Sequence, residues 1–256
     1  MKLFTAVLNF YLNSSVHVAF SVYALIRVSE LYFGLPHNKS LSYFAFFGTI
    51  TGYNFIKYAS ITKIQHQNLS NNLKLIQIFS IICFLFFVYY AIQLKTITLL
   101  FALPLAVLTL LYALPFLNGF QKNLRSVNYL KVIIVSLVWS GFTVVLPVCD
   151  AQLNTVKSIC VLLMFAKCFL FVTTLILPFE IRDVENDIYP LQTIPKKIGV
   201  RNTKIIGLTM LFICVFLEFL TTDNINFRNV FIAICIVCSL LLLMATKSQS
   251  VYYSSL

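Results

Sequence analysis

The chain has 256 residues, of which 60% are hydrophobic and only 11% are charged, with a mean hydropathy of +0.90 and a net charge of +11. A soluble domain of this length needs a larger polar surface, so the composition excludes an ordinary soluble globular protein and predicts a multi-span membrane protein. We attribute the positive charge to membrane topology and attraction to anionic lipid, and we expect no binding of nucleic acid.

Eight apolar stretches have roughly the 17 to 25 residues that a membrane-spanning helix needs. They lie near residues 14–34, 41–59, 74–94, 97–117, 129–149, 156–178, 203–221 and 228–246. The third and fourth stretches run almost together and are separated only at Gln93 and Lys95. We therefore predict an all-α protein, a transmembrane helical bundle of about eight spans, with residues 1–256 in a single integral-membrane domain.

The basic residues lie mostly on one side of this predicted bundle. If the N-terminus is cytoplasmic, 13 lysines and arginines fall on the cytoplasmic side and 4 on the opposite side, while Arg27 and Lys167 lie within spans. Cytoplasmic loops of membrane proteins are enriched in such residues. We therefore expect a multi-pass protein of the bacterial inner membrane with a cytoplasmic N-terminus.

Two cations, Arg125 and Lys131, lie where the predicted fifth span begins, after the polar stretch NGFQKNLRSVN. Taken alone, they are typical of basic residues that anchor the cytoplasmic end of a membrane helix. A functional role for them depends on what lies at the same face of the membrane.

Four of the eight acidic residues lie in one window after the sixth span, FEIRDVENDIYP: Glu180, Asp183, Glu185 and Asp187. On a helix that advances about 100° per residue, Glu180, Asp183 and Asp187 lie within about 60° of one another. Carboxylates on one face repel unless a cation lies among them, and oxygen-only ligands suit Mg²⁺. The alternative is a solvated loop held by Arg182 and nearby lysines. The positive-inside pattern predicts that this window faces the cytoplasm.

The cysteines and histidines point to no other metal site. Cys235 and Cys238 have the C-x-x-C spacing, but they lie in an apolar run without a second pair or a nearby histidine. The three histidines are scattered and form no metal-ligand spacing: His17, His37 and His66.

The stretch FEIRDVENDIYPLQTIPKKIG resembles the second aspartate-rich motif of the UbiA superfamily of intramembrane prenyltransferases. In that family the motif commonly reads N-D-I-R-D-x-x-x-D, followed by T-x-P and a short run that ends in Gly. Glu180 stands where the family usually has the first Asp, and Asp183 and Asp187 match the next two. The tail of the motif is matched by Thr193, Pro195 and Gly199.

A second part of the resemblance lies between the predicted fourth and fifth spans. Family members end the fourth helix with a Tyr-Pro-type sequence, then have basic residues and a Lys that opens the fifth helix. This outline is matched by Tyr112, Pro115, Arg125 and Lys131. In the family, such basic groups hold the diphosphate of the substrate.

The chain departs from the family after the second span, where members have a first aspartate-rich motif, N-D-x-x-D-x-x-x-D. Asn54 keeps the Asn of that motif. The three Asp positions are occupied by Phe55, Tyr58 and Thr62. In one account, Lys57 lies one turn from Asn54 and supplies the positive charge that Mg²⁺ would bring to the diphosphate. In the other, the site has decayed and Lys57 pairs with the surviving carboxylates.

The resemblance implies the family fold, an all-α transmembrane bundle of eight spans or, as is typical of the family, nine. It implies transfer of a prenyl group from an isoprenoid diphosphate to an aromatic or lipid acceptor, with Mg²⁺ as cofactor and membrane lipid as surroundings. The expected metal ligands are Glu180, Asp183 and Asp187. The expected diphosphate-binding residues are Asn54, Lys57, Arg125 and Lys131. Among these groups the expected catalytic residues are Asp183, Asp187 and Lys131.

Two other classes of function remain open at this point. The chain can be a member of the family without turnover, which binds isoprenoids or has a structural role in the membrane. A transporter is disfavoured, because the polar residues cluster at one membrane face and not at the midplane.

Overall fold

A computed structural model of the chain describes residues 2–58, 71–113, 129–151, 159–184, 193–222 and 224–246. In these ranges every regular element is a helix, which confirms the predicted all-α class. The elements are α1 (Lys2–Asn13), α2 (Val16–Tyr32), α3 (Lys39–Tyr58), α4 (Asn71–Gln93), α5 (Thr96–Ala113), α6 (Leu130–Ser140), the π-helical turn η2 (Gly141–Val145), α7 (Leu146–Asp150), α8 (Ile159–Asp183), α9 (Ile194–Ile198), α10 (Val200–Thr221) and α11 (Ile225–Met244).

Six helical segments in the described ranges are long and apolar enough to cross a membrane. They cover Leu73–Gln93, Thr96–Ala113, Leu130–Asp150, Ile159–Arg182, Val200–Thr221 and Ile225–Met244. The predicted spans at 14–34 and 41–59 also form helices, α2 and α3, but α2 has only 17 residues and includes Arg27 and Glu30. The six apolar helices support an integral, multi-pass membrane protein, and the number of spans, eight or nine, stays a prediction.

Helices α4 and α11 expose apolar side chains along much of their length. Leu85 and Ile92 of α4 are 63% and 79% exposed, and Met244 of α11 is 62% exposed. Such surfaces are unfavourable in water, at about 25 cal/mol per Å² of apolar area, and they match the hydrocarbon of a bilayer. The sequence places these side chains outward because the helices are apolar all round.

The described helices cluster into two compact units, each with its own core. Unit 1 comprises Met1–Val107 and Phe142–Val156, and unit 2 comprises Leu108–Gly141 and Lys157–Leu256. The expectation that residues 1–256 form a single domain stays a prediction.

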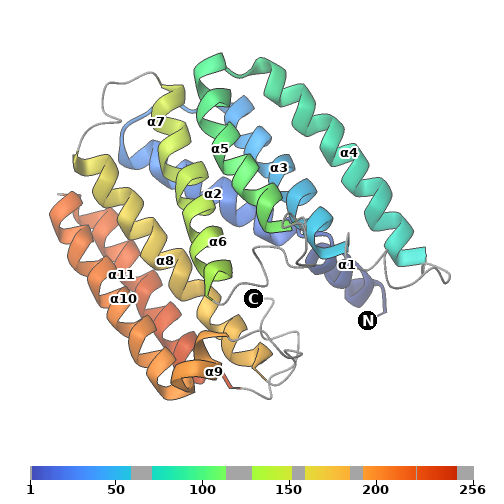
Figure 1. Ribbon diagram of the computed structural model, residues 1–256. Helices are drawn as coiled ribbons and strands as arrows, with labels where there is room; N and C mark the ends of the chain where they lie inside the picture. Colours follow the sequence, from blue (N-terminus) through green and yellow to red (C-terminus); the bar gives the residue numbers. More distant parts are fainter. Residues whose placement is uncertain are drawn as a thin grey trace. The chain divides into compact units, whose positions relative to one another are not determined.

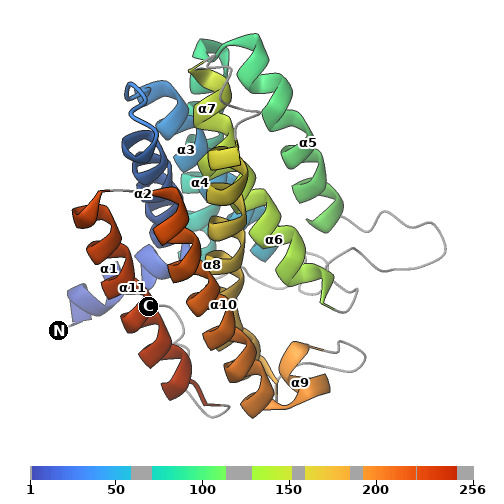
Figure 2. The same ribbon diagram turned by 90° about the vertical axis from the view of Figure 1, so that its left-hand side faces the viewer.

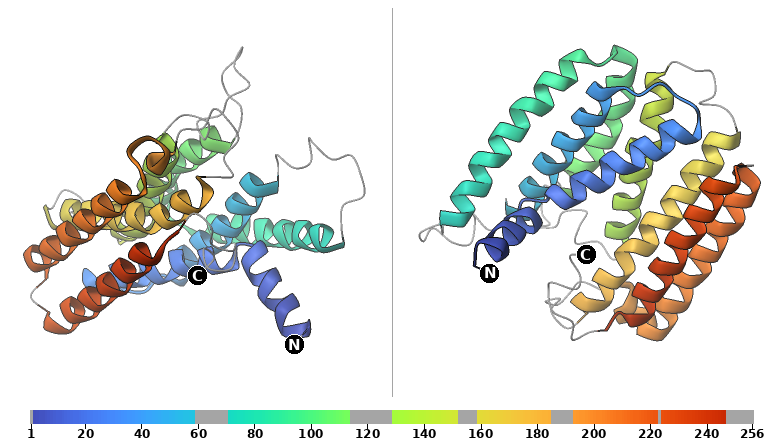
Figure 3. Two further views of the ribbon diagram at one scale, coloured as in Figure 1. Left: turned by 90° about the horizontal axis from the view of Figure 1, so that it is seen from below. Right: turned by 180° about the vertical axis from the view of Figure 1, so that it is seen from behind.

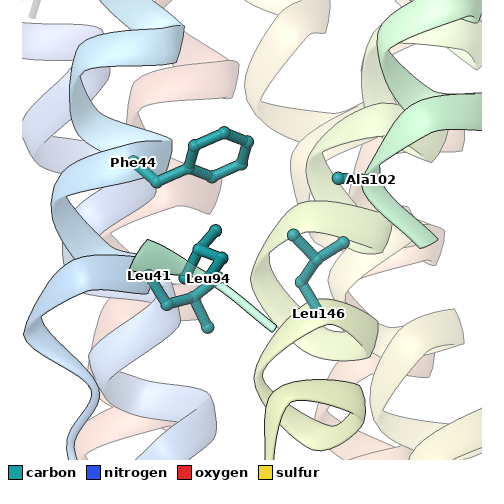
Figure 4. Close-up of a cluster of buried hydrophobic side chains, with 5 residues drawn as sticks. All are labelled: Leu41, Phe44, Leu94, Ala102 and Leu146. Carbon is teal, nitrogen blue, oxygen red and sulfur yellow. The ribbon is translucent and has the colours of Figure 1, made fainter. Parts of the chain in front are cut away.

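In unit 1, α3 packs between α2 and α4 (Figure 3). Figure 4 shows one core cluster of this unit, which is formed by Leu41, Phe44, Leu94, Ala102 and Leu146. Phe44 of α3 also stacks on Phe87 of α4, with ring centroids 4.8 Å apart. Large apolar side chains thus hold α3 to α4, α5 and α7.

A buried polar network in unit 1 joins the end of α2 to the end of α7. The carboxylate of Asp150 accepts hydrogen bonds from Nδ2 of Asn38 at 2.7 Å and from Oγ1 of Thr98 at 2.9 Å. Glu30 pairs with Arg27, and its Oε1 accepts a hydrogen bond from the backbone N–H of Asn38 at 3.2 Å. Both carboxylates are buried and bonded, so this network fixes the packing of α2 and α7.

In unit 2, α8 packs against α6 and α10, and α11 lies along α10 (Figures 1 and 2). Gly207 allows the close approach of α10, because a Cβ at this position would lie 2.5 Å from Cδ2 of Leu242 and 2.9 Å from Cδ1 of Leu177. Leu177 of α8 and Leu242 of α11 belong to a core cluster with Ile181 and Ala245. Three helices therefore meet at this glycine.

Helices α8 and α10 also share a buried ion pair between Lys167 and Glu218. These residues are 3% and 2% exposed, and the Lys167 ammonium lies 5.1 Å from the ring centroid of Phe231 in α11. An isolated charge in a membrane-spanning helix is costly, so each side chain compensates the other.

Candidate functional site

Helix α8 carries the first part of the acidic window. The helix ends at Asp183, and Val184 lies in a turn. Glu180 and Asp183 therefore lie on one helix, as predicted. Asp187 lies beyond the end of the described helix. Glu180 is only 3% exposed, so the apolar helix ends with a buried carboxylate, which needs a counter-charge or hydrogen bonds.

Lys131 supplies that counter-charge from the first turn of α6. Its Nζ lies 2.7 Å from Oε1 of Glu180, while 30% of the Lys131 side chain is exposed. Farther along the same two helices, Oγ1 of Thr173 donates a hydrogen bond to Oγ of Ser136 at 2.9 Å. Both contacts fit antiparallel packing of α6 and α8. The structure thus brings together a predicted diphosphate-binding residue and a predicted metal ligand.

Two buried oxygen atoms at this end of unit 2 have no hydrogen-bond partner within the described residues, the hydroxyl of Tyr129 and Oγ1 of Thr193. Oε1 of Glu180 differs from these two atoms, because it lies 2.7 Å from the Lys131 ammonium. A buried polar atom without a hydrogen bond costs about 1–3 kcal/mol. Such atoms are uncommon in folded proteins, so both hydroxyls are candidates for contact with a ligand.

Helix α9 brings two further cations, Lys196 and Lys197, to the same end of unit 2. Nζ of Lys197 lies 5.3 Å from the ring centroid of Tyr129, and Ile194 packs against the core cluster that includes Ile181 of α8. Figure 2 shows α9 beside the C-terminal end of α8 and the start of α10. The start of α6 and α9 therefore bring Lys131, Lys196 and Lys197 to the end of unit 2 at which α8 ends.

Tyr129 holds an unusual backbone conformation directly before α6. Its φ of 62° and ψ of −23° lie in the left-handed region, which residues with a side chain rarely adopt. Strained backbone of this kind is concentrated at functional sites. Sequence reasoning did not identify Tyr129 or Lys197 as site residues. The only available signal was the position of Lys197 within the PKKIG tail of the acidic motif.

The predicted magnesium site is only partly described. Arg125 and Asp187 lie outside the described residues, and for Asp183 the structure gives the helical backbone alone. Within the described ranges, no three His, Cys, Asp or Glu side chains gather in one place. The buried carboxylate oxygen of Glu180 is the type of donor that Mg²⁺ prefers, so this residue fits the predicted metal. Mg²⁺ binding by Glu180, Asp183 and Asp187 stays a prediction.

Asn54 and Lys57, which were predicted to bind diphosphate, belong to unit 1. The Asn54 side chain is 2% exposed, and its Oδ1 accepts a hydrogen bond from Oγ of Ser15 at 2.9 Å. Its Nδ2 donates to Oγ of Ser80 at 2.8 Å. Nζ of Lys57 donates to the backbone oxygen of Asn13 at 3.3 Å. Asn54 thus connects α2, α3 and α4, and the expectation that both residues face the acidic window stays a prediction.

No family model, curated protein or solved structure matches this chain. The likeness to the UbiA superfamily therefore remains a resemblance of the motif residues. The site in unit 2 is interpreted from its own contacts, burial and charge.

Proposed function

We propose that this chain is a divergent, membrane-embedded prenyltransferase, which moves a prenyl group from an isoprenoid diphosphate to an acceptor. The observation that carries the proposal is the ion pair of Lys131 with the buried Glu180 at the end of an apolar helical unit. An isoprenoid diphosphate needs both parts of such a site, an apolar wall for its chain and charged groups for its head.

The reaction breaks the bond between C1 of the prenyl group and the diphosphate oxygen. The electron pair leaves with the diphosphate, and a nucleophilic carbon or oxygen of the acceptor then bonds to C1 and loses its proton to water. The barrier lies in the negative charge that develops on the leaving group, which positioned cations stabilise.

The residues of unit 2 have complementary roles in this proposal. Lys131 and Lys197 bind and orient the diphosphate, with Arg125 as a further cation from the predicted set. Glu180, Asp183 and Asp187 would hold Mg²⁺, which would supply positive charge to the leaving diphosphate. Glu180 has a second effect, because its carboxylate fixes the Lys131 ammonium at the end of α8. The catalytic residues in this scheme are Asp183, Asp187 and Lys131.

We further propose that the reaction takes place at the cytoplasmic face of a bacterial inner membrane. The support is the excess of basic residues on that side, 13 against 4, in the predicted topology. The acceptor class follows from the family resemblance alone, and it comprises aromatic quinone precursors and lipids.

The experiment is a transfer assay with the full chain in nanodiscs, radiolabelled prenyl diphosphates, Mg²⁺ and a panel of aromatic and lipid acceptors. Glu180→Gln and Lys131→Gln should both abolish a labelled product that the unchanged chain forms. Glu30→Gln is the matched control, because it removes a buried, paired carboxylate in unit 1. Equal loss of product in all three variants would show that only folding had been tested and would remove this support.

A second candidate is an isoprenoid-binding protein without turnover. The observation in its favour is that the Asn54 side chain is engaged by Ser15 and Ser80, so the residue kept from the first aspartate-rich motif has structural partners. Tight binding of a prenyl diphosphate without product, unchanged by chelation, would select this candidate over the enzyme.

A further inference from the structure

Helix α1 of unit 1 has an apolar side and a polar side. Its sequence is KLFTAVLNFYLN, and at about 100° per residue Phe4 and Val7 lie about 60° apart. Asn9 lies about 140° from Phe4 and about 160° from Val7, and Asn13 lies about 40° from Asn9. Helix α1 is therefore amphipathic, unlike α4 and α11, which are apolar all round.

Both sides of α1 are exposed in the described part of unit 1. On the apolar side, Phe10 packs edge-on against Phe79 of α4, with ring centroids 5.4 Å apart. Phe4 and Val7 on the same side are 73% and 61% exposed. Asn9, on the polar side, is exposed as well. Large apolar side chains are unfavourable in water, so α1 fits a boundary with apolar surroundings on one side and polar surroundings on the other.

The chain changes direction between α1 and α2. Ser15, directly before α2, has a φ of 61° and a ψ of 18°, in the left-handed region that residues with a side chain rarely adopt. The left view of Figure 3 shows α1 turned away from the line of α2. The 12 residues of α1 form about 18 Å of helix, while the hydrocarbon core of a bilayer is about 30 Å thick. Helix α1 is therefore neither a span nor a straight extension of α2.

The contact with α4 gives the level of α1 relative to the membrane. Phe79 lies six residues (79 minus 73) after Leu73, where the candidate span of α4 begins, and this is about 9 Å along the helix axis. Phe79 also packs against a core cluster of unit 1, so the contact is well supported. In the same first turns, α4 exposes Leu75 and Ile78. Amphipathic helices at a membrane surface bury their apolar side about 5–10 Å deep, which matches this level.

We propose that α1 is an interfacial helix, which lies at the boundary between the lipid headgroups and the acyl chains. Phe4 and Val7 insert among the acyl chains, and the side with Asn9 faces the headgroups and water. The partner is the lipid bilayer, because the exposed apolar side of α1 lies at the same level as the lipid-facing start of α4. The inference depends neither on turnover nor on the carboxylates of unit 2.

The test uses the full chain in phosphatidylcholine nanodiscs, with the photoreactive residue benzoylphenylalanine in place of Phe4, Val7, Asn9 or Leu85. After irradiation, mass spectrometry measures how much of each variant is joined to phospholipid and at which part of the lipid. Asn9 is the matched control on the polar side of the same helix. Leu85, which is 63% exposed in the middle of α4, is the reference for deep lipid. All four side chains are exposed, so the replacements should leave the packing intact.

The probes in place of Phe4 and Val7 should join to phospholipid at the glycerol or at the first carbons of the acyl chains. The probe in place of Leu85 should join nearer to the methyl end. The probe in place of Asn9 should give less lipid adduct than the probe in place of Phe4 by about fivefold or more, because an interfacial helix keeps its polar side out of the acyl chains.

Four results would overturn the inference. Equal amounts of lipid adduct from Phe4 and Asn9 would show that α1 has no lipid-facing side. A crosslinked dimer through Phe4 would show that a second copy of the chain covers this side, and the absence of any adduct would place α1 in water. Attachment as deep as that from Leu85 would make α1 part of a membrane span. If the replacement of Phe4 prevents folding, the comparison of Val7 with Asn9 decides in the same way.

Discussion

Nζ of Lys131 in α6 lies 2.7 Å from Oε1 of Glu180 in α8, and the carboxylate is almost completely buried. The pair joins two residues that are 49 positions apart in the sequence (180 minus 131) and that come from separate predicted parts of one site. Because the pair lies at the end of an apolar helix, the proposed site has an apolar surface next to charged groups. The first prediction concerns this pair.

Glu180→Gln should lower the rate of prenyl transfer by about a hundredfold or more, because it removes a charge that orients Lys131 and would bind the metal. The unfolding temperature should change little, since the amide keeps the size of the carboxylate and 30% of the Lys131 side chain remains exposed to solvent. The measurement is product formation beside thermal unfolding in detergent. A fall in both for Glu180→Gln, with neither changed in Glu30→Gln, would assign Glu180 a structural role instead.

Chelation tests the cofactor proposed for the site in unit 2. With EDTA, transfer of the prenyl group should stop, because the carboxylates of the acidic window act through Mg²⁺. Adding Mg²⁺ back should restore transfer. Transfer that continues in EDTA would contradict the predicted cofactor.

Helix positions could be predicted from the sequence, because length and apolar composition determine which segments can cross a membrane. The predicted stretch 74–94 corresponds to α4, Asn71–Gln93, and the polar break at Gln93 and Lys95 does separate two helices. Helix α1 was not predicted, because its 12 residues are too few for a span. Helix α9 was not predicted for the same reason, because it has only five residues.

The pairing of side chains across helices could not be predicted in the same way. Lys167 and Glu218 are 51 residues apart, and helical periodicity shows which residues share a face but not which helix that face meets. The contact between Lys131 and Glu180 could not be predicted for the same reason. Arg125 and Asp187 lie outside the described residues, so their predicted roles rest on the family resemblance.

Breaking the Lys167–Glu218 pair should destabilise unit 2. Glu218→Gln leaves the Lys167 ammonium without its buried counter-ion, which costs about 3–5 kcal/mol when one partner of a buried pair is removed. The double variant Lys167→Met with Glu218→Gln should recover much of this loss, because no buried charge remains. Unfolding by denaturant in detergent measures both variants. A double variant no more stable than Glu218→Gln would rule out the ion pair as the cause.

Gly207→Ala should also destabilise the packing of α10 on its neighbours. The added methyl group would lie 2.5 Å from Leu242 and 2.9 Å from Leu177, so both leucine side chains must move, at a cost of about 1–3 kcal/mol. Gly52→Ala is the matched control, because a Cβ there has no atom within 4 Å and alanine favours a helix. The comparison is made by thermal unfolding. Equal stability of the two variants would show that the leucines adjust without cost.

Thr193→Val separates ligand binding from folding in the candidate site of unit 2. Oγ1 of Thr193 is buried without a hydrogen bond in the described residues, so valine, which has the same shape without the hydroxyl, should raise stability by about 1 kcal/mol. If this hydroxyl binds the diphosphate, the same change should lower the rate of transfer or raise KM about tenfold, because a donor to the ligand is lost.

Thr203→Val is the control, since Oγ1 of Thr203 donates to the backbone oxygen of Gly199 at 2.9 Å. That control should lose stability and keep its transfer rate per folded molecule. A more stable Thr193→Val with unchanged transfer would exclude Thr193 from the site and leave Lys131, Glu180, Tyr129 and Lys197 among its described members.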